Sequence, residues 1–352
     1  MPMQQEAQPQ LQPTRQLVDM QLSLSTFPDL AFLAKGAMCK CFIARRCRQS
    51  PSLVVLKMSI ENGPKEAERD LNTELSMLQN LSHPNLARLF GAGKTPKGKT
   101  FIVVEYLEGG TLRSKLDAAA GGLGFWAACK HALELASVMR YMHEEAIPGR
   151  CILHRDLKPD NLAFTGTRMK LVNLGLAKVI RRSNDGANDV YQMTGEVGSL
   201  RYMAPEVARQ RPYNEKVDVH SFGFILWEMV TGWQPFSGLS PDMFMTQVVQ
   251  LGHRPMLQCR WNPIFKSLLA SCWAELPRDR PSFSQIHDAL EALLSDRDVT
   301  TFGRMRWRQS GEDSESHLDA SASSTSGQQS KRGGMFSRLL GGRRAPGLRQ
   351  HS

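Results

Sequence analysis

One short loop of the sequence carries a carboxylate, an ammonium and an amide. The run His-Arg-Asp-Leu-Lys-Pro-Asp-Asn occupies positions 154–161, so that Asp156, Lys158 and Asn161 can converge. In such a group the carboxylate accepts a hydroxyl proton, the lysine neutralises a phosphate and the amide oxygen binds Mg²⁺. The run therefore predicts phosphoryl transfer, and an ordinary polar turn before a strand is the weaker interpretation.

A lysine and a glutamate further towards the N-terminus indicate a buried ion pair. Lys57 lies inside an apolar stretch, 53–58, that is typical of a strand, and burying an unpaired ammonium there is costly. Glu74 lies on the leucine-bearing face of a predicted helix over residues 65–81. We therefore expect Glu74 to face inward and to pair with Lys57.

With these residues in this order, the sequence resembles the eukaryotic protein kinase family over roughly residues 27–298. The later motifs also fit, namely Ala-Pro-Glu ending at Glu206, Asp218 in Asp-Val-His-Ser-Phe-Gly, and Arg280 in Arg-Asp-Arg-Pro. Lys-Pro-Asp after Asp156 and Cys-Trp at 272–273 resemble the tyrosine-kinase-like serine/threonine group. The resemblance implies ATP and Mg²⁺ as cofactors and a protein substrate with a Ser or Thr acceptor.

The resemblance also assigns roles to individual positions. Asp156 would orient and deprotonate the acceptor hydroxyl, and Lys158 would offset charge on the γ-phosphate. The other implied ATP-site positions are Lys57, Glu74, Gly36, Cys41, Val55, Glu105, Leu107 and Ala163. Asn161 and Asn173 would hold the metal ion. Asp218 would hold the catalytic loop by its backbone, and Arg280 would pair with Glu206.

The activation segment of the family corresponds here to residues 173–206. In the family, an arginine such as Arg155 pairs with a phosphate on this segment. Thr194 is the predicted acceptor, with Tyr191 as an alternative, and the phosphate would order the segment through charge-assisted hydrogen bonds. Ser199 is expected to hydrogen-bond near the catalytic loop.

Two departures from the family pattern bear on activity. The Gly-rich loop keeps only Gly36 of its three glycines, so the backbone should approach phosphate less closely, although Lys35 and Lys40 add attraction. Asp-Phe-Gly is replaced by a sequence beginning at Asn173, which loses a carboxylate that Mg²⁺ prefers. We therefore expect weakened Mg²⁺-dependent activity with Mn²⁺ preferred. The alternative is a pseudokinase, a scaffold that binds nucleotide weakly or not at all.

Cys39 is a candidate reactive thiol. It lies between Lys35 and Lys40, and nearby cations lower the pKa of a thiol. We expect it to react faster than the other six cysteines, with an unremarkable exposed thiol as the alternative.

The strands and helices expected around these residues indicate an α+β, two-lobed kinase fold. Strands at 53–58 and 101–104 flank one helix in a small N-lobe over residues 27–107. A larger helical C-lobe follows over 108–298, with helices expected at 130–143, 218–231 and 283–295. The Gln/Pro-rich residues 1–26 and the basic Ser/Gly/Arg-rich residues 299–352 are predicted to be disordered.

Composition sets broader limits. The chain has 352 residues, of which 41% are hydrophobic and 22% charged, as in a globular protein. No apolar run approaches the roughly 20 residues of a membrane-spanning helix. Seven cysteines without a regular spacing suit a reducing compartment, so we expect a cytoplasmic protein.

The net charge of +10 raises the question of polyanionic partners. Residues 301–352 hold nine of the basic and four of the acidic side chains, so half of the excess lies there. We find no nucleic-acid-binding motif and expect no nucleic-acid partner. The segment 331–344 mixes cations with apolar residues and is a candidate for weak contact with anionic membranes. The sequence does not predict an oligomeric state.

Overall fold

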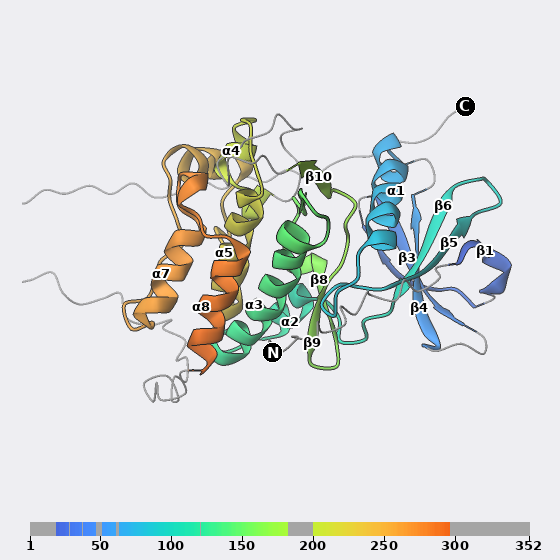
Figure 1. Cartoon of the computed structure of the whole chain (residues 1–352), viewed down its shortest axis with the longest axis horizontal. Helices are drawn as coiled ribbons and strands as arrows, with labels where there is room; N and C mark the ends of the chain where they lie inside the picture. Colours follow the sequence, from blue (N-terminus) through green and yellow to red (C-terminus); the bar gives the residue numbers. More distant parts are fainter. Residues whose placement is uncertain are drawn as a thin grey trace, which may run out of the picture. The chain divides into compact units, whose positions relative to one another are not determined.

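The computed structural model describes residues 19–295, apart from 28, 37, 47–50, 61–62, 120 and 182–199. A six-stranded sheet with one helix comes first, and a largely helical region follows (Figure 1). This confirms the predicted α+β, two-lobed fold class. The expected disorder of 1–18 and of 299–352 falls outside the described residues.

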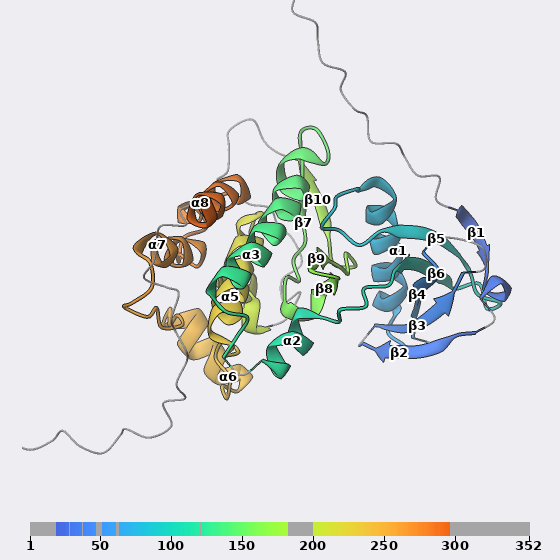
Figure 2. The same ribbon diagram turned by 90° about the horizontal axis from the view of Figure 1, so that it is seen from below.

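The N-lobe sheet has the strand order β1-β5-β6-β4-β3-β2, with β1 and β2 at its opposite edges (Figure 2). Every neighbouring pair is antiparallel except β1 and β5, which are parallel. The strands are β1 (Asp19–Ser23), β2 (Ala31–Lys35), β3 (Cys39–Arg45), β4 (Leu53–Ser59), β5 (Leu89–Lys94) and β6 (Thr100–Glu105). The two predicted strands correspond to β4 and β6.

The prediction that residues 1–26 are disordered is wrong for residues 19–26. These residues form β1 and a 3₁₀ turn, Leu24–Thr26. A Cβ atom at Gly91 would lie 2.2 Å from Cδ1 of Leu22, and one at Gly93 would lie 1.9 Å from the Leu22 carbonyl oxygen. β1 therefore pairs with β5 because two glycines leave room for it, a signal that periodicity does not carry.

Strand register gathers the predicted N-lobe ATP-site residues on one face of the sheet. Cys41 pairs with Lys57 and Val55 with Val104 across neighbouring strands, and side chains two residues apart share a face. Helix α1 (Lys65–Asn80) lies beside this sheet and buries Leu71, Glu74 and Leu78, as its predicted periodicity requires.

The C-lobe is built around α5 (Lys216–Thr231), every residue of which is buried. The other helices are α2 (Leu112–Ala118), α3 (Phe125–Arg140), α4 (Pro205–Ala208), α6 (Pro241–Phe244), α7 (Pro263–Cys272) and α8 (Phe283–Ser295). Helix α3 starts earlier than predicted and passes into a π-helical turn, Tyr141–Glu145. No helix among the described residues is both long and apolar enough to cross a membrane.

Two short antiparallel strand pairs carry the predicted catalytic segments. β8 (Leu162–Thr165) pairs with β9 (Arg168–Leu171), and β7 (Arg150–Leu153) pairs with β10 (Lys178–Arg181). The loop 154–161 therefore starts directly after β7 and ends directly before β8. Asn173 lies two residues after the end of β9, so both candidate segments lie at strand ends.

Candidate active site

Lys57 makes one hydrogen bond within the N-lobe and a second one that reaches the C-lobe. Its Nζ donates to Oε2 of Glu74 on α1 and, over 2.9 Å, to Oδ1 of Asn173. Burial alone would lower the pKa of Lys57, but the charge of Glu74 raises it above its ordinary value. Lys57 is therefore a charged lysine at a largely buried position, and the ion pair expected with Glu74 is present.

The catalytic-loop residues are linked to one another and to Asn173. Asn173 Nδ2 donates to Asn161 Oδ1 over 3.1 Å, and Asn161 Nδ2 donates to Asp156 Oδ2 over 2.9 Å. Lys158 Nζ lies 3.0 Å from the same Asp156 oxygen. A single hydrogen-bonded series thus runs from Glu74 through Lys57, Asn173, Asn161 and Asp156 to Lys158.

The backbone of the catalytic loop is held by Asp218 at the start of α5. Its two carboxylate oxygens accept hydrogen bonds from the amides of His154 and Arg155, both 2.8 Å long. Arg155 has a φ of 68°, which a non-glycine residue adopts only when its surroundings impose it. The expected role of Asp218 as a backbone anchor agrees with these contacts.

His143, which the sequence analysis missed, supports the same carboxylate. Its Nε2 donates to Asp218 Oδ2 over 3.0 Å, since an ionised carboxylate only accepts. Burial alone would raise the pKa of Asp218, but the hydrogen bond from His143 holds it below its ordinary value. The π-helical turn that carries His143 is the signal, since such turns are frequent at functional sites.

The connection between the lobes places a second ion pair beside the predicted hinge residues. Lys170 Nζ donates to both oxygens of Glu105, at 2.7 and 2.8 Å, and Lys170 pairs across β8 and β9 with Ala163. The side chain of Glu105 is thus occupied, so any contact with ATP falls to the backbone of Glu105 or Leu107. A lysine between Met169 and Leu171 was the available sequence signal for this pair.

The predicted reactivity of Cys39 is contradicted. The thiol is buried, and burial raises its pKa to about 11 although Lys57 partly offsets the effect. The neighbouring Lys35 and Lys40 were expected to lower it, but desolvation outweighs their charges. Cys41 lies on the same face and also has a raised pKa.

The ion pair expected between Arg280 and Glu206 is present and buried. The guanidinium donates to both carboxylate oxygens, at 2.7 and 2.9 Å. Arg155 donates to the carbonyl oxygen of Leu176 over 2.7 Å and to the hydroxyl of Tyr213 over 3.2 Å. Thr194 and Ser199 lie outside the described residues, so their predicted roles stay predictions.

A third buried charged group was not found from the sequence. Glu228 of α5 accepts hydrogen bonds from the hydroxyl of Tyr202 at 2.6 Å and from Arg113 of α2 at 2.7 Å. Its side chain is fully buried, so these partners are needed to offset the lost hydration. A single carboxylate inside the apolar run at 222–230 was the available signal.

The expected metal ligands do not fit a divalent cation in this arrangement. Oδ1 of Asn173 accepts from Lys57, and Oδ1 of Asn161 accepts from Asn173. Both oxygens are neutral, whereas Mg²⁺ prefers at least one carboxylate. A cation at Asn161 Oδ1 would also lie close to the Asn173 NH2 group that donates to this oxygen, and a cation at Asn173 Oδ1 would lie close to the charged Lys57 ammonium.

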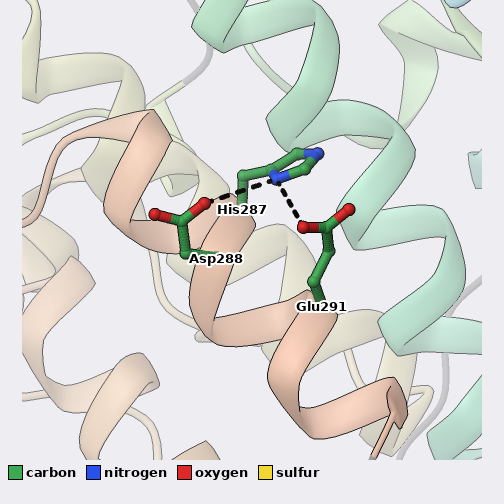
Figure 3. Close-up of side chains that lie close together, drawn as sticks. All are labelled: His287, Asp288 and Glu291. Carbon is green, nitrogen blue, oxygen red and sulfur yellow. Dashed lines mark ion pairs between the residues drawn. The ribbon is translucent and has the colours of Figure 1, made fainter.

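One other group of ligand-type side chains lies on α8 (Figure 3). His287 Nδ1 is 3.8 Å from Asp288 Oδ1 and 3.6 Å from Glu291 Oε2. Both carboxylates are mostly exposed, so these are weak surface ion pairs that contribute little. They lie on a different element from the residues described above.

Comparison with known families agrees with this geometry. Residues 30–290 match the family of protein tyrosine and serine/threonine kinases, and the chain belongs to this family. The kinases of this family use ATP and a divalent metal ion.

Its relatives include protein kinases of plants and animals. The serine/threonine-protein kinase VIK of Arabidopsis thaliana is 36% identical over 271 residues, which cover 76% of this chain and 60% of VIK. The serine/threonine/tyrosine-protein kinase HT1 of the same plant is 33% identical, covering 64% and 55%. Mitogen-activated protein kinase kinase kinase 7 of Bos taurus is 35% identical, covering 67% and 40%. The chain therefore spans only 40 to 60% of these relatives.

Proposed function

We propose that the protein is an ATP-dependent serine/threonine kinase of the tyrosine-kinase-like group with low activity. The observation that carries the proposal is the hydrogen-bonded series that joins Glu74, Lys57, Asn173, Asn161, Asp156 and Lys158. Family membership and the serine/threonine kinases among its relatives support the same reaction. A cytoplasmic location, and a domain extending over 27–298, belong to this proposal.

The chemistry needs one base and several cations. Asp156 accepts the proton of a Ser or Thr hydroxyl, whose oxygen forms a bond to the γ-phosphorus of ATP. The bond between that phosphorus and the β–γ bridging oxygen breaks, and ADP leaves. Lys57, held by Glu74, positions the phosphates, and Lys158 offsets charge on the transferred group. Asn161 and Asn173 as metal ligands, and a preference for Mn²⁺, stay predictions.

Around this centre the proposal assigns further positions. Gly36, Cys41 and Val55 would cover the nucleotide from the sheet, and Ala163 and Leu107 would contact it from below and from the hinge. Phosphate on Thr194 would pair with Arg155, whose guanidinium already lies near Leu176 and Tyr213. Each of these assignments can be tested by substituting the residue concerned.

Transfer of radiolabelled phosphate tests the proposal directly. The purified full chain is incubated with γ-labelled ATP, Mg²⁺ or Mn²⁺, and casein as a general Ser/Thr acceptor. Label should appear on Ser or Thr of casein or of the chain itself, and Asp156→Asn should abolish it because it removes the base. Label that persists in Asp156→Asn would come from a contaminant and would count against the proposal.

The second candidate is a nucleotide-binding scaffold that transfers little phosphate. It is favoured by the hydrogen bonds that already engage the oxygens of Asn161 and Asn173. A wild-type chain that binds ATP yet transfers no label under any of these conditions would decide for the scaffold.

A further inference from the structure

The Asn173 side chain makes two hydrogen bonds of opposite sense. Its oxygen accepts from Lys57 Nζ over 2.9 Å, and its nitrogen donates to Asn161 Oδ1 over 3.1 Å. An ionised aspartate has no proton to donate, so it would face the Asn161 oxygen without a bond. This connection from β4 to the catalytic loop therefore requires an amide at position 173.

The backbone at this position narrows the choice of residue. Asn173 has a φ of 66°, in the left-handed region that asparagine, aspartate and glycine tolerate better than other residues. Alanine would be strained there whatever its contacts. The side chain, not the backbone, thus separates asparagine from aspartate as occupants.

Charges along the series balance without a metal ion. Lys57 pairs with Glu74 and Lys158 pairs with Asp156, leaving Asn161 and Asn173 as neutral links. A carboxylate at position 173 would add an uncompensated negative charge beside Glu74 and Asp156. Such a site would need a cation, whereas the existing one does not.

A pair of lysines offers positive charge for phosphate. Lys35 and Lys40 are register partners in β2 and β3, on either side of Gly36. Like charges directly opposite each other repel, and an anion between them would relieve that repulsion. They can supply part of the charge that a metal ion would otherwise bring to the phosphates of a nucleotide.

We propose that Asn173 is a positioning residue that replaces the metal ion as the link between Lys57 and Asn161, so that nucleotide binds without a divalent cation. The part that concerns nucleotide rests on the proposed function. The part that concerns the link does not, because the link exists in the unliganded protein and stabilises it.

The test compares the full chain with Asn173→Asp and Asn173→Gly, both of which tolerate the backbone conformation. In EDTA without nucleotide, each variant should melt about 2–4 °C below the wild type, because each loses the hydrogen bond to Asn161. Binding of a fluorescent ATP analogue follows, in EDTA and in Mg²⁺. The wild-type dissociation constant should differ less than threefold between the two, and that of Asn173→Asp should be at least tenfold lower in Mg²⁺.

Asn85→Asp is the matched control. Asn85 is a buried asparagine that donates to the carbonyl oxygen of Met169 over 2.8 Å, outside the site. Its aspartate variant should also melt earlier but should bind the analogue equally with and without Mg²⁺. In EDTA, the Lys35→Gln variant should bind the analogue more weakly than the wild type does.

Two results overturn the proposal. One is a wild type that binds the analogue tenfold or more weakly in EDTA than in Mg²⁺. The other is Asn173→Asp melting in EDTA at the wild-type temperature. If no variant binds nucleotide under either condition, the proposed function and the nucleotide part fail together, and the melting temperatures alone decide whether Asn173 is the link.

Discussion

At the scale of single residues, Asn173 sets the charge that the active site presents to a metal ion. Replacing it with aspartate should create a carboxylate ligand next to Asn161 and raise Mg²⁺-dependent transfer. We expect a gain of about one to three decades, corresponding to about 1.4 to 4 kcal/mol in barrier height. Initial rates of label transfer at saturating ATP, with Asp156→Asn as blank, measure it.

Three outcomes of the Asn173→Asp substitution distinguish the possible functions of the site. A measurable wild-type rate that rises strongly identifies a weakened kinase. A silent wild type that the substitution activates identifies a pseudokinase whose defect is the metal site. A folded variant that neither binds nucleotide nor transfers phosphate would contradict the catalytic roles given to Lys57 and Asp156.

His220 makes stability depend on pH. It is fully buried in α5, and burial, together with the charges of Arg280 and Arg254, holds its pKa well below the ordinary value. In the unfolded chain a histidine titrates near a pKa of about 6.5, so below that pH the unfolded state binds the extra proton. The contribution of neutral His220 to the free energy of unfolding is therefore fully present above that pH. It is lost progressively as the pH falls below it.

We expect His220→Phe to reduce this loss. The slope of unfolding free energy against pH between pH 7 and 5 should shrink by up to one proton, at most about 1.4 kcal/mol per pH unit. Urea unfolding at several pH values measures the slope. His253→Phe, at an exposed position, is the control and should leave it unchanged. An identical slope in wild type and His220→Phe would show that another group is responsible.

Residue types and spacing predicted the members of the site and the ion pair between Lys57 and Glu74, but not the hydrogen bonds of Asn173. Motif order identified Lys57, Glu74, Asp156 and Asn161. The contact between the two asparagine amides depends on side-chain rotation, which a one-dimensional pattern does not encode. The predicted reactivity of Cys39 was wrong for a related reason. The sequence showed the nearby charges, but it did not show the burial that dominates the pKa of this thiol.

At the scale of elements, β1 depends on glycines in β5. A Cβ at Gly91 would meet only β1, lying 2.2 Å from Leu22 Cδ1 and 2.7 Å from the Asp19 carbonyl oxygen. Gly91→Ala should therefore push β1 away and destabilise the full chain by about 1–3 kcal/mol. The midpoint of urea unfolding measures the effect.

Truncation supplies the control for this prediction. In a chain that starts at residue 24, β1 is missing, so Gly91→Ala should change stability little. The difference between the two backgrounds is the coupling energy of a double-mutant cycle. Equal destabilisation by Gly91→Ala in the two backgrounds would mean that the side chain at position 91 does not affect β1.

Helices with a strong hydrophobic periodicity were predictable from the sequence. Elements that form only through contacts with a distant segment were not. Helix α8 has the predicted bounds, and α1 ends within one residue of its prediction, since each buries one apolar stripe. β1 has mostly exposed residues and gains its structure from hydrogen bonds to β5. Its polar–apolar alternation covers only five residues, which is too short to predict a strand next to the Gln/Pro-rich N-terminus. The π-helical turn after α3 likewise forms where His143 meets Asp218, a contact from a distant segment.

At the scale of the whole molecule, the basic charge divides between the kinase domain and the C-terminal residues. Residues 301–352 carry an excess of five positive charges out of the total of ten. Within them, 331–344 contains five Lys or Arg side chains together with Met335, Phe336, Leu339 and Leu340. Each cation close to an anionic bilayer contributes about 1 kcal/mol to binding, and apolar side chains add to it.

This composition predicts weak, salt-sensitive binding to acidic membranes. The full chain should sediment with phosphatidylserine-rich vesicles at low ionic strength better than a chain ending at residue 300. Raising the salt to about 0.5 M should release it, because screening shortens the reach of the charges. A full-length variant with the five cations of 331–344 changed to Gln separates charge from length and should behave like the truncated chain. Equal sedimentation of all three proteins would exclude the membrane role of this segment and leave its charge without a lipid partner.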